Sequence, residues 1–422
     1  MNELEQRVLD AIDADAMVTF LCGLVAIESL DGNETTVQRY MAASMRGFGL
    51  EVDEWEIDVA ALREHPAFCW EVERSEGLGV VGMIGEDRGG RSLIFNGHID
   101  VVPAGDPANW QYPAWQGTVA DGQVYGRGAL DMKGGLVCGL FAAKAIRDAG
   151  VRLQGQLQVQ SVIGEEDGGC GMLATILRGH TADAAIIMEP TELCVTPAQA
   201  GALSFRMTVF GNAAHGCVRE EGTSAIEKFW PIHQALLELE AVRNAREQSP
   251  LFARYRLPYP LSIGTVQAGN WPSSVPETLV AEGRYGIAVG EDAASARDEF
   301  TAAVQRVAES DPWLRAHPPT IEWCGGQFDS ASTASDHPII GALTQAYTAA
   351  TGATTRLEGV TYGADMRLLV NLGQVPTVMF GPGDVRLAHK PDEHVPVADL
   401  IAVVRTLALT ALRFCGVEDT RT

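Results

Sequence analysis

Short apolar runs alternate with helix-like stretches over the first two hundred residues of the chain. Four runs have the length and composition of buried strands: Leu78 to Ile84, Leu93 to Phe95, Leu157 to Ile163 and Ala184 to Met188. Apolar residues at helical spacing occupy other segments: Leu4 to Ile27, Met41 to Phe48, Gly135 to Ala149 and Gly171 to Leu177. This alternation predicts an α/β domain in which helices flank a mixed, largely parallel sheet.

The pattern changes at about Gly201, where strands with one apolar face replace the fully apolar runs. The strands expected there are Ala202 to Phe210, Leu261 to Val266, Leu279 to Ile287 and a strand around Thr320 to Cys324. The expected helices are Ala225 to Val242 and Glu291 to Glu309. These elements predict a ββαβ-type α+β domain at residues 201–330, inserted between two parts of the α/β domain at residues 1–200 and 331–422.

Charge and cysteine usage narrow the class of protein. The formal charge of −24 argues against nucleic acid or an anionic membrane as a partner, since both require a basic face. The eight cysteines are scattered without a C-x-x-C pair, and the start of the chain lacks a leader pattern. The apolar run Phe20 to Ile27 is far shorter than the roughly 20 residues of a membrane helix. We therefore expect a cytoplasmic protein with reduced thiols.

A His-x-Asp pair stands at the end of one apolar run. His98 and Asp100 are two residues apart and so share a face of the strand, at the carboxyl end where open α/β sheets bind their ligands. A metal-bound imidazole commonly donates a hydrogen bond from its second ring N–H to a carboxylate, and Asp100 is placed to accept it. An exposed pair in a turn is the alternative for these residues taken alone.

Further carboxylates and a second histidine follow other apolar runs. Glu165 and Glu166 are adjacent, so one can bind a metal while the other acts as a general base, although an acidic strand end can also be a solvated loop. Two divalent ions could share a bridging aspartate and divide the remaining ligands between them. The predicted metal ligands are His98, Asp131, Glu166, Glu189 and His389. Nitrogen and oxygen ligation suits zinc, with cobalt or manganese as substitutes.

The order of these motifs resembles that of the co-catalytic di-zinc aminoacylases and carboxypeptidases, which include acetylornithine deacetylase, succinyl-diaminopimelate desuccinylase and bacterial glutamate carboxypeptidase. The matching segments are NGHIDVVPAG, YGRGALDMKGG, GEEDGG, MEPTE, GNAAHG and FGPG followed by AHKPDEHVPV. The resemblance implies that Asp131 bridges two zinc ions, with His98 and Glu189 on one and Glu166 and His389 on the other. It also implies a cis peptide at Asp131-Met132.

The resemblance further implies roles for residues that do not bind metal. Glu165 becomes the general base and Asp100 the partner of His98. The inserted domain becomes a lid and dimerisation domain, from which His215 reaches the site of a second copy to stabilise an oxyanion. Candidate substrate-binding residues are Arg284 and the loop that contains Asp365 and Arg367, since a guanidinium suits a substrate carboxylate. The loop carries Ala364 where the family commonly has threonine, and Ser273-Ser274 precedes Val275 where many members have asparagine.

The sequence therefore predicts a homodimeric, metal-dependent hydrolase that removes the acyl group from a small N-acylated amino acid or related amine. Carboxypeptidase or dipeptidase, N-formyl deformylase and ureido-type amidohydrolase activities on the same scaffold are alternatives. An inactive binding or assembly protein is the alternative from another class. The acyl group and the amine are left open.

Overall fold

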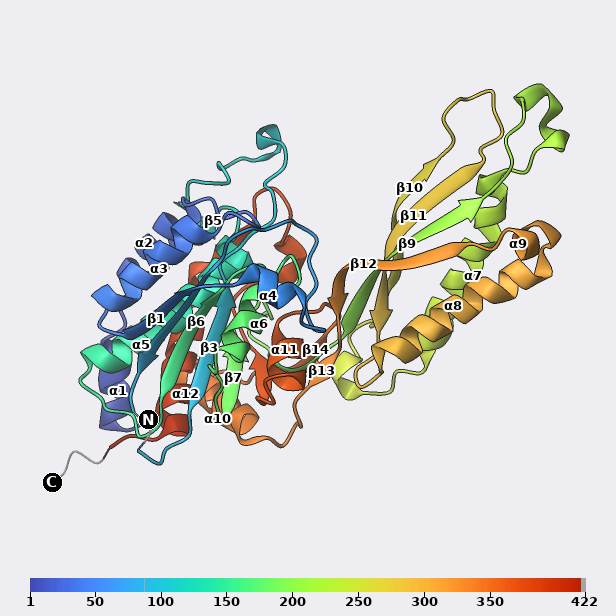
Figure 1. Cartoon of the computed structure of the whole chain (residues 1–422). Helices are drawn as coiled ribbons and strands as arrows, with labels where there is room; N and C mark the ends of the chain where they lie inside the picture. The colour runs from blue at the N-terminus through green and yellow to red at the C-terminus, as the bar shows by residue number, and fades with distance from the viewer. Residues whose placement is uncertain (87, 419–422) are drawn as a thin grey trace. The chain divides into compact units, whose positions relative to one another are not determined.

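A nine-stranded mixed sheet forms the centre of the first of two units (Figure 1). The computed structural model describes residues 1–86 and 88–418, and the first unit comprises Met1–Pro197, Ser332–Glu358 and the described residues from Ala364 onward. The strand order is β1-β2-β6-β3-β7-β15-β8-β13, with β14 beside β8. The strands are β1 (Glu51–Glu56), β2 (Leu78–Ile84), β3 (Leu93–His98), β6 (Leu157–Val162), β7 (Ala184–Ile187), β8 (Val195–Gln199), β13 (Ala331–Ser332), β14 (Leu357–Val360) and β15 (Thr377–Met379).

The sheet contains both parallel and antiparallel pairs of strands. Strand β3 runs parallel to β6 and β7, and β7 runs parallel to β15, whereas the β1–β2, β2–β6 and β8–β15 pairs are antiparallel. All residues of the four central strands are buried. The predicted mixed sheet is confirmed, and the carboxyl ends of β3, β6 and β7 meet at one edge because their registers are aligned.

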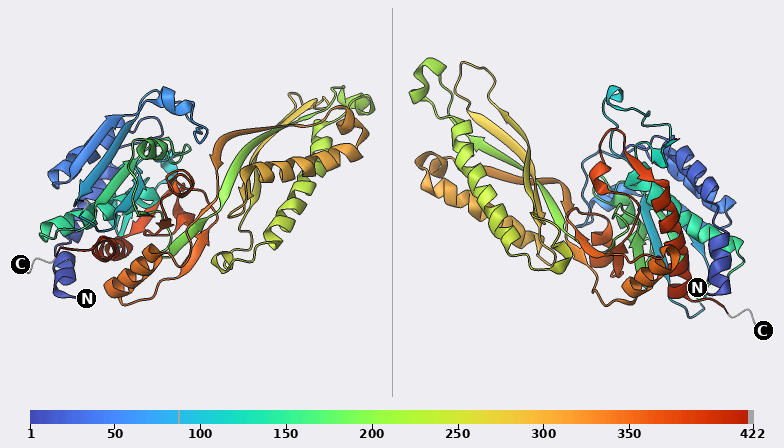
Figure 2. Two further views of the ribbon diagram at one scale, coloured as in Figure 1. Left: turned by 60° about the horizontal axis from the view of Figure 1, so that its bottom comes forward. Right: turned by 180° about the vertical axis from the view of Figure 1, so that it is seen from behind.

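Helices cover both faces of the central strands (Figure 2). On β3, Gly97 lies against Leu136, which belongs to the helix at Gly134–Asp148. The preceding residue, Asn96, points to the opposite face, where its side-chain nitrogen lies 3.2 Å from the sulfur of Met172 in the helix at Cys170–Leu177. The α-helices of this unit are α1 (Glu3–Asp10), α2 (Ala14–Val25), α3 (Thr35–Gly47), α4 (Val59–Arg63), α5 (Gly134–Asp148), α6 (Cys170–Leu177), α10 (Pro338–Thr351), α11 (Met366–Asn371) and α12 (Val397–Cys415).

The apolar spacing from Leu4 to Ile27 is divided between two helices. Helix α1 ends at Asp10 and α2 begins at Ala14. The Asp13 side chain accepts a hydrogen bond from the Ala16 N–H and caps the second helix, which is why the pattern does not continue as one element.

A small sheet and a π-helical turn complete the first unit. The sheet has the order β16-β5-β4, formed by β4 (Thr118–Ala120), β5 (Gln123–Tyr125) and β16 (His394–Pro396). The π-helical turn η2 (Ala129–Lys133) follows β5 and leads into α5. Short 3-10 turns, η1 (Pro107–Asn109) and η5 (Val385–Leu387), lie in the loops.

The second unit, Ala198–Ala331 with Gly359–Gly363, is built on an antiparallel sheet of order β10-β11-β9-β12. The chain order is strand, helix, strand, strand, helix, helix, strand, which has one strand and two helices more than the expected ββαβ-type arrangement. The two long helices lie along one face of the sheet (Figure 2). The elements are β9 (Gly201–Phe210), α7 (Ala225–Ala245), β10 (Leu261–Ala268), β11 (Thr278–Ile287), α8 (Ala293–Ser310), α9 (Pro312–Ala316) and β12 (Thr320–Phe328), with 3-10 turns η3 (Gly216–Glu221) and η4 (Pro250–Phe252).

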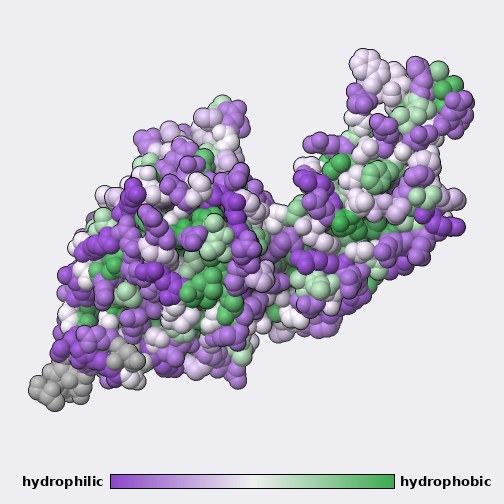
Figure 3. Space-filling model, viewed as in Figure 1, coloured by the Kyte–Doolittle hydropathy of each residue, from purple (hydrophilic) through white to green (hydrophobic). Residues whose placement is uncertain are grey.

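Alternation along β9 explains the one-sided sheet of this unit. Leu203, Phe205, Met207 and Val209 are buried and point to the helices, while the residues between them are more exposed. The side of the molecule seen in Figure 3 is largely hydrophilic, in keeping with the charge of −24. Among the described residues, no helix has the length and apolar character needed to cross a membrane.

Candidate metal centre

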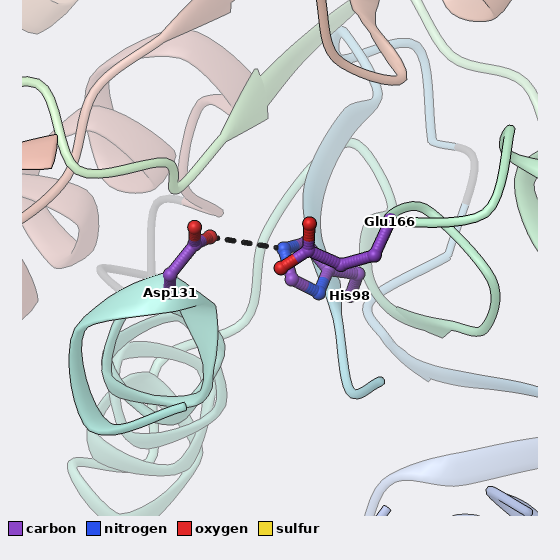
Figure 4. Close-up of side chains that lie close together, drawn as sticks. All are labelled: His98, Asp131 and Glu166. Atoms are coloured by element: carbon purple, nitrogen blue, oxygen red, sulfur yellow. Dashed lines mark hydrogen bonds and ion pairs between the residues drawn. The ribbon is translucent and has the colours of Figure 1, made fainter. Parts of the chain in front are cut away.

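His98 is the last residue of β3, and its side chain points toward carboxylates from other segments (Figure 4). Its Nε2 atom lies 3.2 Å from Oδ1 of Asp131 and 4.0 Å from Oε1 of Glu189. Its Nδ1 atom donates to the main-chain carbonyl oxygen of Asp100 at 3.0 Å, and the Asp100 carboxylate is farther away, at 3.8 Å. The ring is therefore oriented by the backbone of Asp100, and Nε2 faces the carboxylates.

A second histidine lies near the other carboxylate oxygen of the same aspartate. Nε2 of His389 lies 3.4 Å from Oδ2 of Asp131 and 3.0 Å from Oε1 of Glu166. His389 has a φ of +60° and is half exposed, whereas His98 is buried. Each oxygen of Asp131 thus faces a different histidine, and each histidine has a second carboxylate beside it.

The backbone around Asp131 is held by a buried glutamate. The Asp131-Met132 peptide is cis, as the resemblance implied. Oε1 of Glu393 accepts hydrogen bonds from the N–H groups of Leu130 at 3.0 Å and Asp131 at 3.2 Å. The other oxygen pairs with the buried guanidinium of Arg127. Glu393 stands in the AHKPDEHVPV segment, but the sequence does not predict this role, because a side chain that supports the backbone leaves no spacing signal.

The loop after β6 carries Glu165 and Glu166 and is anchored by several groups. The Glu166 N–H donates to Oδ2 of Asp100 at 3.0 Å. Asp167 accepts from the N–H groups of Glu71 and, at 2.6 Å, Val72. These bonds fix the loop beside the strand ends and place the Glu165 carboxylate in a cluster with His98 and Glu189.

Burial and mutual charge shift the pKa values of the clustered groups. Burial raises the pKa of Glu165 well above its usual range, and the Glu189 and Asp365 carboxylates add to the effect against the opposing charge of His98. Burial alone would lower the pKa of His98, but the surrounding carboxylates outweigh it and the pKa is well above its ordinary value. Hydrogen bonds to Asp131 and Glu166 raise the pKa of His389 to about 10.

The donor set fits divalent cations. Two groups, His98 with Asp131 and Glu166, and His98 with Glu165 and Glu189, each bring one ligand atom per residue to within 4.8 Å of the others. Imidazole nitrogens with carboxylate oxygens are ligands of zinc, cobalt and manganese. A cation would also offset the repulsion among these buried carboxylates, which two histidines alone do not neutralise.

The remaining predicted site residues are divided between the units. In the second unit, His215 is exposed and accepts a hydrogen bond at Nδ1 from the Cys217 N–H at 3.2 Å, and Arg284 donates to the Thr361 carbonyl oxygen at 2.9 Å. In the first unit, Arg367 is buried and donates to the Gly168 carbonyl oxygen at 2.6 Å. Asp365 is buried at the start of α11.

The fold matches that of a known class, the metal-dependent hydrolases of amide bonds. The model of peptidase family M20/M25/M40 matches residues 94–413, and the chain belongs to this family. The predicted family and the prediction of an enzyme acting on amide bonds are confirmed.

Relatives and solved structures agree with this membership. The chain is 31% identical to the N-formyl-4-amino-5-aminomethyl-2-methylpyrimidine deformylase of Halalkalibacterium halodurans, over 77% of this chain and 79% of that protein. It is 29% identical to the acetylornithine deacetylase of Myxococcus xanthus, over 82% and 85% of the two chains. The fold is similar to that of human carnosine dipeptidase 1, with a TM-score of 0.76, 16% identity and coverage of 98% and 99%.

Proposed function

We propose that the protein is a di-zinc deacylase that hydrolyses the amide bond of a small N-acylated amino acid or related amine. The observation that carries the proposal is the position of Asp131, whose two carboxylate oxygens lie 3.2 Å from His98 and 3.4 Å from His389. In this proposal His98 and Glu189 would hold one ion, Glu166 and His389 would hold the other, and Asp131 would be shared by both.

Zinc bound in such a site would lower the pKa of a bound water to near neutrality, and the zinc would also polarise the carbonyl of the scissile amide. Cobalt and manganese are possible substitutes. The residues of the chain supply proton transfer and the orientation of the metal-binding groups. Glu165 accepts the proton of the attacking water and passes it to the leaving nitrogen, a role that its position beside His98 and Glu189 supports. Asp100 orients His98 through its carbonyl oxygen and the Glu166 loop through its carboxylate.

A formyl group on an amine is a second candidate for the bond that is cut. The relative from Halalkalibacterium halodurans is named for the removal of a formyl group from an aminomethylpyrimidine, and it exceeds 30% identity over most of both chains. Deformylation and deacetylation break the same kind of bond, so the same catalytic groups serve both reactions.

The proposal is tested by assaying the purified protein, loaded with zinc or cobalt, on N-formyl, N-acetyl and N-succinyl amines and on dipeptides. We expect metal-dependent release of the free amine from at least one N-acyl substrate, at a higher kcat/KM than for any dipeptide. Elemental analysis should find about two bound ions per chain. Hydrolysis of dipeptides alone would show a peptidase, and no bound metal would rule out the proposed mechanism.

We also propose a homodimer joined through the second unit, with His215 stabilising the oxyanion across the interface. Ile226, Trp230 and Leu237 share one face of α7 and remain exposed in the described chain, which supports burial of this face by a second copy. The exposed His215 side chain is available to a substrate. A cytoplasmic location is proposed as well, supported by the lack of any disulfide bond in the described residues.

Ultracentrifugation of the metal-loaded protein tests the dimer. Trp230→Glu places a charge on the α7 face and should shift the mass toward the monomer and lower kcat, while Glu238→Gln on the same helix should do neither. A wild-type monomer with full activity would exclude both the dimer and the role of His215 across an interface.

A further inference from the structure

Asp365 is a buried carboxylate without a hydrogen-bond partner in the described part of the chain. Its side chain is 1% exposed, and neither Oδ1 nor Oδ2 has a partner. Asp365 immediately precedes α11 and could cap it, yet it makes no side-chain bond to the helix amides. Buried carboxylates are normally paired or hydrogen-bonded, so an unpartnered one points to a group that it binds.

The Asp365 carboxylate lies against the loop that carries the proposed general base. A Cβ atom on Gly169 would come within 2.5 Å of Asp365 Oδ1, so only glycine leaves room for the carboxylate there. The charge of Asp365 helps to raise the pKa values of both Glu165 and Glu189. The carboxylate is therefore a close neighbour of the groups proposed to cut the amide.

The buried cations of the first unit are already engaged by the protein. Among the described residues, each has protein acceptors: Arg74 pairs with Glu34, Arg127 with Glu393, Lys133 with the carbonyl oxygens of Leu24 and Ile27, and Arg367 with that of Gly168. A substrate carboxylate next to Asp365 would be repelled, whereas an N–H donor would be bound. The local charge thus favours an amine with donor groups over an amino acid.

We propose that Asp365 accepts hydrogen bonds from an amino-substituted nitrogen heteroaromatic ring, such as an aminopyrimidine, on the amine side of the substrate. This inference rests on the proposed deacylase function and specifies the amine. The exocyclic amino group of such a ring donates to one carboxylate oxygen, and a protonated ring nitrogen donates to the other, in a paired geometry like that of guanidinium and carboxylate.

The test measures binding by calorimetry, so that it does not depend on turnover. The probes are the amine 4-amino-5-aminomethyl-2-methylpyrimidine and its analogue with a methyl group in place of the 4-amino group. We expect the metal-loaded wild type to bind the amino compound about 10- to 100-fold more tightly, as for a hydrogen bond to a charged group. Asp365→Asn should remove most of this preference, and Asp53→Asn, at a surface ion pair on β1, should keep it.

Equal affinity of the wild type for the two compounds overturns the inference, and so does a preference that survives in Asp365→Asn. Equal affinity in the wild type overturns the inference even where the variant does not fold. Hydrolysis of the N-formyl derivatives is measured separately. A binding preference without hydrolysis of any N-acyl compound supports the role of Asp365 and contradicts the deacylase, whereas hydrolysis without the preference does the reverse.

Discussion

Glu165→Gln is expected to lower kcat for amide hydrolysis by about 10²- to 10⁴-fold, the usual contribution of a general acid–base group. The substitution keeps the size and polarity of the side chain but removes its capacity to take a proton from water. Glu165 is 7% exposed and shares a cluster with His98 and Glu189, so a base from the solvent does not easily take its place. Steady-state kinetics on the best N-acyl substrate measure the loss.

Metal content and a matched variant separate this effect from damage to the site. The bound metal per chain should be the same in Glu165→Gln as in the wild type, because the proposed ligands are unchanged. Glu51→Gln, at an exposed position of β1, should have wild-type kinetics. A Glu165→Gln protein that retains its metal and loses less than about tenfold in kcat would give the role of base to another residue.

Local patterns predicted the strands that carry the site, because burial on both faces of a sheet leaves continuous apolar runs. Leu78 to Ile84 matches β2 residue for residue, and the run ending at Phe95 belongs to β3, which continues to His98. The apolar run is shorter than the strand because the last residues of β3 include the polar Asn96 and His98.

Support of the site by distant groups could not be predicted from local spacing. Glu393 is 262 residues from Asp131 and holds its N–H, and Arg127 completes the pair. Arg367 is predicted to bind a substrate carboxylate, and in the folded chain its guanidinium donates to the Gly168 carbonyl oxygen, a contact that no spacing in the sequence indicates; its role toward the substrate stays a prediction. A sequence shows that a cation is present but not whether a backbone carbonyl already engages it.

The same limit applies to Asp365. Its motif is visible in the sequence, but its buried, unpartnered oxygens appear only once α11 and the Gly169 turn are packed together. The partner of a carboxylate depends on tertiary contacts. The proposal about the amine side of the substrate therefore needed the folded structure.

Removal of the metal by a chelator is expected to abolish hydrolysis and to destabilise the first unit. A ligand present at 100 times its Kd stabilises the folded state by about 2.7 kcal/mol, and that contribution is lost with the ion. The carboxylates of Glu166 and Glu189 also regain their mutual repulsion. Thermal unfolding with and without chelator, followed by addition of zinc, measures the loss of stability and its recovery.

The metal affinity should rise with pH, and the pKa shifts give the sign. Without a cation, the carboxylates around them raise the pKa of His98 and bring that of His389 to about 10, so both rings carry protons near neutrality. A metal must displace these protons. For each displaced proton, the metal affinity rises by about tenfold per pH unit as long as the pH is below the pKa of that histidine. Asp131, whose pKa is held low by the two histidines against the effect of burial, stays ionised throughout.

Asp131→Asn should lower the affinity by more than the roughly 10- to 100-fold typical of losing an outer partner of a metal ligand, because both proposed ions depend on this residue. Asp183→Asn, which removes a surface carboxylate bonded to Ser92, serves as the control and should bind metal like the wild type. Competition with a chromophoric chelator between pH 6 and 9 measures both effects. An affinity that falls as the pH rises, or an Asp131→Asn protein that binds two ions as tightly as the wild type, would remove Asp131 and the two histidines from the proposed metal centre.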